Sequence, residues 1–276
     1  MSEQDHPPYH SVFPSVDRDV AAAERLPQTP QTTNPAYRLA FHDPDFLMRD
    51  ELRPVRLQLE LLKPELAMNE RGIVSTVVLF GGARIRRPGE GTGMAAKLSR
   101  YWEEARRFAE LASRECVRRG GGEFVVVTGG GPGVMEAGNL GASEAGAVSA
   151  GLNIMLPHEQ APNPYVTPDL SFNFHYFAIR KMHFLMRAAA IAVFPGGFGT
   201  LDELFETLTL IQTQRMEPIP LLLFGEEFWR RVIDFDVLTE AGTISPEDLS
   251  LLTFVDDAET AWGHVARVHG LHRGAA

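Results

Sequence analysis

Three glycine-rich segments follow short apolar runs that predict buried strands. They are Gly81-Gly82, the turn from Thr128 to Gly133, and the turn from Pro195 to Thr200. Parallel strands end at a common edge of their sheet, where such sheets bind ligands. Residues without a Cβ let the backbone approach a ligand closely, and a helix that starts there offers unpaired N–H groups to an anion. The sequence therefore predicts a site for a small ligand with an anionic group.

The segment TGGGPGVME (128–136) differs from the common nucleotide loops. It is not a Walker A loop, because no Gly-Lys-Ser/Thr follows, and it is not GxGxxG, because Val134 is the sixth residue counted from Gly129. A dinucleotide cofactor is therefore not predicted. A tight strand-to-helix turn without any ligand is the alternative interpretation. The candidate ligand-binding residues of this turn are Gly129, Gly130, Gly131 and Gly133.

The segment PGGFGTLDE (195–203) suits a phosphate, since consecutive N–H groups and a hydroxyl would lie at the start of a helix. Its candidate phosphate-binding residues are Gly196, Gly197, Gly199 and Thr200. Glu203 has two interpretations at this stage. It is either a catalytic carboxylate or the last residue of a Thr200-x-x-Glu203 capping box, with Thr200 as the helix N-cap.

The pair Arg180-Lys181 lies on a predicted helix, directly before a predicted strand and the turn from Pro195 to Thr200. A guanidinium there could bind a phosphate or a ribose-bound oxygen, although such pairs are commonly solvated on helix surfaces. No metal site is predicted, because the histidines lack an HExxH spacing and Cys116 is the single cysteine. Serine-based hydrolysis is not supported either, since no GxSxG occurs.

Short apolar runs alternate with helical patterns from Ser75 onward. The pattern predicts an α/β fold with a Rossmann-like, doubly wound parallel sheet and helices on both faces. We expect a flexible Pro-rich arm over residues 1–40, a helical extension over 41–72, and a nucleotide-binding catalytic domain over 73–276. The predicted strands are 76–80, 124–127, 147–155, 191–194, 221–224 and 252–255, and helices are expected at 97–118, 134–145, 178–189, 200–213, 228–239 and 258–269.

Composition limits the partners and the location of the chain. A formal net charge of −10 argues against a duplex nucleic-acid binder, which usually presents a basic face. No stretch approaches the roughly 18 apolar residues of a transmembrane helix, and the N-terminus lacks the pattern of a signal peptide. We therefore expect a cytoplasmic protein that binds a small molecule, and neither nucleic acid nor a membrane.

Four segments taken together resemble the LOG (LONELY GUY) family, and more narrowly its longer bacterial branch. They are TGGGPGVMEAGNLGA (128–142), LPHEQAPNPYV (156–166), IRKMHF (179–184) and PGGFGTLDELFETLTLIQT (195–213), and the resemblance covers roughly residues 73–256. The family consists of cytokinin riboside 5′-monophosphate phosphoribohydrolases, often mislabelled lysine decarboxylases. The resemblance implies hydrolysis of the N-glycosidic bond of a cytokinin riboside or adenosine 5′-monophosphate to free base and ribose 5-phosphate.

Carried over residue by residue, the resemblance implies that Arg180 and Glu203 are catalytic. The PGGxGT loop would hold the 5′-phosphate, the turn from Thr128 to Gly133 would line the nucleotide pocket, and Glu136 would help to bind the base or ribose. The resemblance also implies a homo-oligomer, and the sequence indicates no cofactor. The chemistry agrees, because glycosidic cleavage passes through an oxocarbenium-like state that a carboxylate stabilises.

Three rival functions remain open, and one of them is an interaction protein that acts through the Pro-rich arm. Ala83 stands where long family members usually carry Ser, and 188–190 are alanines where the family commonly has an Asp. The alternative function is therefore a non-catalytic carrier or sensor of a nucleotide-like ligand. A pyridoxal phosphate decarboxylase is the third rival, but it needs a lysine for its Schiff base. Lys181 is the one lysine near the predicted pocket.

Overall fold

The computed structural model describes residues 15–90, 92–156 and 161–271 of the chain. These form two compact units, residues 1–59 and 60–276. In the first unit, helix α1 (Val16–Ala23) lies within the range expected to be a flexible arm, and residues 1–14 lie outside the described residues. Helices α2 (Pro44–Leu47) and α3 (Arg53–Glu70) follow, and α3 continues into the second unit.

The second unit contains a seven-stranded sheet in which each pair of neighbouring strands is parallel. The strand order is β4-β3-β2-β1-β5-β6-β7, which confirms the doubly wound Rossmann-like fold. The strands are β1 (Thr76–Phe80), β2 (Val125–Thr128), β3 (Ser149–Ile154), β4 (Ser171–Phe174), β5 (Ala188–Val193), β6 (Leu221–Phe224) and β7 (Thr253–Val255).

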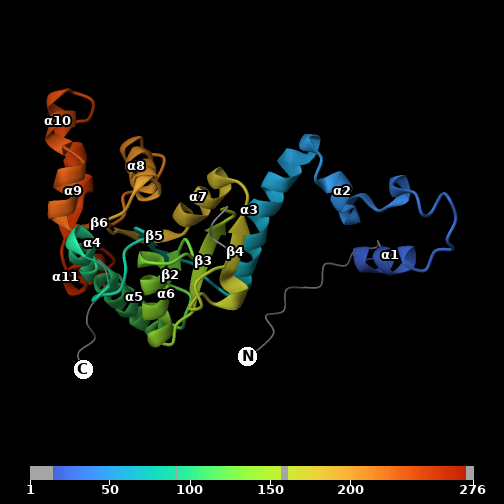
Figure 1. Cartoon of the computed structure of the whole chain (residues 1–276), viewed down its shortest axis with the longest axis horizontal. Helices are drawn as coiled ribbons and strands as arrows, with labels where there is room; N and C mark the ends of the chain where they lie inside the picture. The colour runs from blue at the N-terminus through green and yellow to red at the C-terminus, as the bar shows by residue number, and fades with distance from the viewer. Residues whose placement is uncertain (1–14, 91, 157–160, 272–276) are drawn as a thin grey trace. The chain divides into compact units, whose positions relative to one another are not determined.

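Helices cover both faces of the sheet (Figure 1). The strand residues alternate between two cores: Val77 and Leu79 of β1 pack with the α5 and α6 side, whereas Val78 and Phe80 pack with the α7 and α8 side. This double burial explains why the central strands are short, continuous apolar runs. The helices are α4 (Gly93–Leu98), α5 (Arg100–Arg118), α6 (Val134–Glu144), α7 (Phe177–Leu185), α8 (Phe198–Gln212), α9 (Glu226–Val232), α10 (Phe235–Glu240) and α11 (Ala258–Val268).

Several elements differ from the sequence expectation. The helix expected over 228–239 is two helices, α9 and α10. The strand β4 was not predicted, because this edge strand buries only alternate side chains and so lacks a continuous apolar run. The helix expected to reach residue 189 ends at Leu185, and Ala188 pairs with Thr76 as the first residue of β5. Alanine favours helices, and here pairing with the neighbouring strand outweighs that preference.

The order of the strands reverses between β1 and β5. From β1 the sheet grows through β2, β3 and β4 on one side, and from β5 through β6 and β7 on the other. The loops after β1 and β5 therefore leave the sheet toward opposite sides and open a crevice at its carboxyl edge, where ligands of such folds bind. Both of these loops are glycine-rich, as the sequence had indicated.

Helices α5 and α6 pack closely because Gly141 has no side chain. A Cβ at Gly141 would lie 2.0 Å from the backbone oxygen of Arg106. We expect Gly141→Ala to destabilise the protein by about 3 kcal/mol, since rigid backbone must move apart. As a control, Gly263→Ala on α11 meets no atom within 4 Å and should gain about 0.5 kcal/mol from helix propensity. Urea unfolding of both variants measures the difference, and equal stabilities would contradict this packing argument.

Candidate active site

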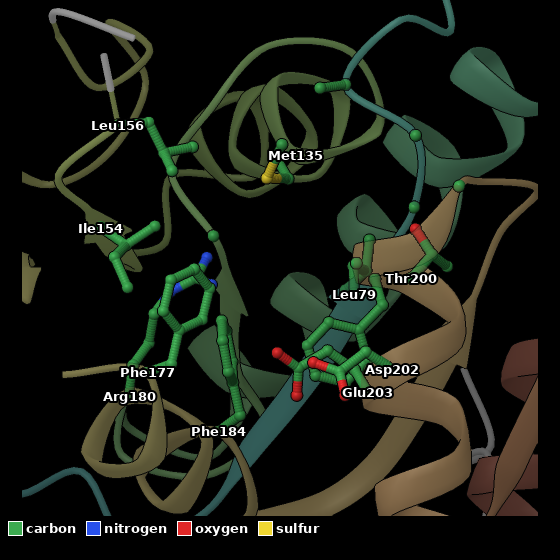
Figure 2. A pocket seen from close by; sticks show the side chains of 17 residues that line it. Leu79, Met135, Ile154, Leu156, Phe177, Arg180, Phe184, Thr200, Asp202 and Glu203 are labelled. Carbon is green, nitrogen blue, oxygen red and sulfur yellow. The ribbon is translucent and has the colours of Figure 1, made fainter. Parts of the chain in front are cut away.

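A cavity of about 350 Å³ lies at the carboxyl edge of the sheet, at the crevice between β1 and β5. Figure 2 shows Arg180 and Phe177 on one wall, and Glu203 and Asp202 on another wall that α8 provides. The cavity thus brings together the two residues to which the resemblance assigns catalysis. Its lining residues are Leu79, Phe80, Gly81, Gly82, Ala83, Gly129, Met135, Ile154, Leu156, Phe177, Arg180, Phe184, Gly197, Gly199, Thr200, Asp202 and Glu203.

Arg180 contacts β3 and an aromatic ring of its own helix, α7. Its Nε donates a hydrogen bond to the backbone oxygen of Leu152 at 2.7 Å, and its guanidinium lies 5.0 Å from the centre of the Phe184 ring. A Cβ on Gly129 would lie 2.7 Å from Nη2 of Arg180. The first glycine of the TGGG turn therefore makes room for the arginine, and the guanidinium is oriented before any ligand arrives.

Glu203 is a buried carboxylic acid, with only 6% of its surface exposed. Its Oε2 atom has no hydrogen-bond partner among the described residues. Burial raises the pKa of Glu203 to about 7, because the charged form is poorly solvated. Lys181 and Arg180 lower this pKa, whereas Glu206 and Asp202 raise it. A carboxyl that titrates near neutral pH inside a cavity is suited to proton transfer or to stabilising a developing positive charge.

The capping interpretation of Glu203 is wrong. Helix α8 begins at Phe198 and its N-cap is Gly197, so Thr200 lies inside the first turn. None of the side chains that the structure describes caps this helix. The helix starts before the position that the Thr-x-x-Glu pattern indicates, and it therefore leaves Glu203 one turn further along, facing the cavity.

The first turn of α8 leaves the backbone of two glycines open to the cavity. A Cβ at Gly197 or Gly199 would meet no atom within 4 Å, so both backbones are open to a ligand, and both residues line the cavity together with Thr200. The N–H groups of a helix's first turn lack intrahelical acceptors and favour an anion. Gly196 has a different role: a Cβ there would lie 2.1 Å from Oγ1 of Thr200, so it permits close packing behind the loop.

The turn from Thr128 to Gly133 brings only one of its four candidate glycines into the cavity lining, namely Gly129. Gly130 donates its N–H to Oγ1 of Thr128 at 2.9 Å, and a Cβ on Gly133 would lie 2.5 Å from the oxygen of Gly82. Gly131 is buried, and its oxygen accepts a hydrogen bond from a side chain at 3.0 Å. Three of the glycines therefore shape the turn.

Sequence reasoning missed two asparagines that fix this turn. Nδ2 of Asn163 lies 3.1 Å from the oxygen of Gly130 and 2.9 Å from Oδ1 of Asn139. Asn139 in turn accepts a hydrogen bond from the Thr128 hydroxyl at 2.7 Å. A fully buried amide network of this kind is rigid, because each unmet hydrogen bond would be costly. The signal in the sequence was two isolated asparagines among apolar neighbours. No local pattern predicts that these two side chains form a hydrogen bond in the fold.

Glu136 lies outside the cavity lining. Its Oε1 forms an ion pair with Nη2 of Arg87 at 2.9 Å, and the Arg87 guanidinium lies 4.8 Å from the ring centre of Trp102. The structure thus places Glu136 in a contact with the loop after β1. A direct part in binding the base or ribose stays a prediction.

The described residues contain no group of three or more His, Cys, Asp and Glu that could hold a metal ion. Cys116 is buried in the core, and burial raises the pKa of its thiol to about 11. Among the helices of the described ranges, none is long and apolar enough to cross a membrane. Part of the LPHEQAPNPYV segment, residues 157–160, lies outside the described residues.

The raised pKa of Glu203 makes stability depend on pH. A folded-state pKa of about 7, against the usual 4.5, gives stability that is complete below pH 4.5 and is lost as the pH rises through 7. We expect the free energy of unfolding of Glu203→Gln, relative to that of the wild type, to increase by about 2 kcal/mol from pH 5 to pH 8. Urea unfolding at the two pH values measures this gain. Glu217→Gln, at an exposed position, should show no such gain, and a pH-independent difference for Glu203→Gln would refute the buried-acid description.

Fold and site together define a doubly wound α/β protein with a cavity at its topological switch point. Residues 135–265 match the model of a family described as "possible lysine decarboxylase". The match begins at Met135 and so includes Arg180 and Glu203. It is consistent with the LOG-type resemblance stated above, because LOG proteins often carry that label.

No curated protein matches the chain. Solved structures that match include the molybdenum cofactor binding protein from the phototrophic bacterium Rippkaea orientalis, at 16% identity and TM-score 0.47, covering 71% of this chain and 97% of that one. The protein TM1055 matches at 20% identity and TM-score 0.45, covering 70% and 99%. The Moco carrier protein from Chlamydomonas reinhardtii matches at 16% and 0.45, covering 72% and 99%. Values this low carry no information on ligand or activity.

The arrangement of Lys181 does not suit a pyridoxal phosphate decarboxylase. That chemistry needs a lysine amine in the pocket to form a Schiff base. The Nζ atom of Lys181 is 2.8 Å from Asp202 and 3.0 Å from Glu206, and Lys181 does not line the cavity that Arg180 and Glu203 share. The word decarboxylase in the family description therefore finds no support in the site.

Proposed function

We propose that the protein hydrolyses the N-glycosidic bond of a nucleoside 5′-monophosphate, with adenine or a modified adenine as the base, to give free base and ribose 5-phosphate. One observation carries the proposal. Glu203, a buried carboxyl whose Oε2 has no hydrogen-bond partner within the described part of the chain, lines one cavity with Arg180 and the open first turn of α8. The LOG-type motifs of the sequence agree with it.

Each part of the cavity has a role in this reaction. The backbone of Gly197 and Gly199 and the hydroxyl of Thr200 bind the 5′-phosphate, which holds the ribose at a fixed distance from Glu203. The Glu203 carboxylate stabilises the oxocarbenium-like state and orients or deprotonates the attacking water. Arg180 neutralises negative charge on the substrate. The base lies against the apolar wall formed by Met135, Ile154, Leu156 and Phe177.

The test is release of free base from AMP and from isopentenyladenosine 5′-monophosphate, followed by chromatography, with ribose 5-phosphate quantified in the same samples. Equal amounts of base and ribose 5-phosphate support the hydrolase. Adenosine, which lacks the phosphate, should be a far poorer substrate because its binding to the first turn of α8 is lost.

The alternative function, a carrier or sensor of a nucleotide-like ligand, predicts a different result in the same experiment. AMP would bind, as measured by calorimetry, and no base would appear. That outcome would reject the hydrolase for these substrates.

A further inference from the structure

Lys181 connects two helices immediately behind the cavity. It follows Arg180 on α7, and its Nζ atom lies 2.8 Å from Oδ2 of Asp202 and 3.0 Å from Oε2 of Glu206 on α8. Both contacts are ion pairs. The Lys181 side chain is 16% exposed and that of Glu206 is 32% exposed, whereas Asp202 is 55% exposed, so water screens the contact with Glu206 less than the contact with Asp202.

The two ion-pair partners of Lys181 lie on either side of Glu203 in the sequence. Asp202 and Glu206 are four residues apart and therefore lie on the same face of α8, one turn above the other. Three carboxyl groups thus share little more than one helical turn, an arrangement that repulsion between like charges disfavours. The positive charge of Lys181 offsets this repulsion in the turn.

We propose that Lys181 is a positioning residue for the reaction: by bridging Asp202 and Glu206 it fixes this turn of α8 against α7 and keeps the Glu203 carboxyl facing Arg180 across the cavity. The inference rests on the function proposed above. It assigns Lys181 no contact with the substrate, since Lys181 lines the hollow on the outer side of α8 and not the cavity.

Electrostatics support this geometry. The charged groups acting on Glu203 are Lys181 and Arg180 from α7, which lower its pKa, and Glu206 and Asp202 from α8, which raise it. Burial alone would lower the pKa of Lys181, but its bonds to Asp202 and Glu206 outweigh this effect and raise it. Lys181 therefore stays charged, and its removal would both take away a cation and leave two flanking carboxylates unneutralised.

The test uses the full chain with Lys181→Met and Lys181→Arg. Its first readout needs no activity: the stability difference between each protein and its Glu203→Gln form is measured by urea unfolding from pH 5 to pH 9. We expect the pH at which Glu203 titrates to rise by about one pH unit in Lys181→Met and to have its wild-type value in Lys181→Arg. An unchanged titration in Lys181→Met would overturn the proposal.

The second readout is the pH profile of base release. In Lys181→Met, kcat/KM at pH 7 should fall about tenfold and the loss should shrink toward pH 9, with KM little changed. A loss equal at every pH, or one not restored by Lys181→Arg, would instead show a merely structural role. If the wild type releases no base from any substrate, the proposed function fails, while the first readout still decides the role of Lys181 in fixing Glu203.

A further variant guards against misfolding of Lys181→Met. In Asp202→Asn/Glu206→Gln, Lys181 keeps its positive charge and loses its two carboxylate partners. The pKa of Glu203 is then still lowered by Lys181 and no longer raised by Asp202 and Glu206. The titration of Glu203 should then move to lower pH, opposite in sign to Lys181→Met. Movement to higher pH, or none, would overturn the inference.

Discussion

Replacing Glu203 by glutamine should lower base release about 10³-fold while leaving the binding of AMP nearly intact. The amide keeps the size of the side chain but can neither carry the negative charge that an oxocarbenium-like state needs nor accept a proton from water. Because Glu203 is buried, water is poorly able to stabilise the developing positive charge once the carboxylate is absent. Steady-state kinetics combined with calorimetric titration of AMP separate the two effects.

The control for this prediction is Glu217→Gln, which makes the same chemical change at an exposed position outside the cavity. Its activity should equal that of the wild type. Because the pKa of Glu203 is about 7, the wild-type rate should also rise as the pH passes through 7, where the carboxylate forms. A Glu203→Gln protein that still turns over at a tenth of the wild-type rate would rule out a catalytic role for this carboxyl.

Replacing Arg180 by alanine should lower kcat/KM about 10²-fold, mainly through the loss of a positive charge beside the substrate. The guanidinium already has a fixed position, since it donates to Leu152 and lies over the ring of Phe184. Arg180→Lys should recover only part of the loss, because an ammonium cannot reproduce the planar fork of donors. Kinetics of the three proteins at constant pH provide the measurement.

Gly129→Ala offers an independent check on Arg180 without changing its charge. The added Cβ would lie 2.7 Å from Nη2 of Arg180 and 2.8 Å from Sδ of Met135, so both flexible side chains must shift. We expect a smaller loss, about tenfold, at nearly unchanged stability. Full activity in Gly129→Ala would show that the position of the guanidinium does not matter.

The sequence predicted the fold and brought Arg180 and Glu203 to one edge of the sheet, because both follow from local patterns and the topology of parallel strands. It misplaced the start of α8, since a Thr-x-x-Glu pattern cannot reveal that Gly197 is the N-cap. The role of Asn163 could not be predicted because its partners are distant in the sequence: Gly130 and Gly131 lie 33 and 32 residues away, and Asn139 lies 24 residues away. Long-range contacts of this kind depend on packing that no local pattern encodes.

The reversal of strand order also bears on when the pocket comes into existence during folding. The two halves of the sheet are joined only where β1 pairs with β5, and residues 81–187 separate these strands along the chain. Closing so long a loop is slow compared with forming the local βα units. The loops after β1 and β5, which both line the cavity, therefore meet late, and a substrate that contacts both loops would bind only the completed sheet and so pull the folding equilibrium toward it.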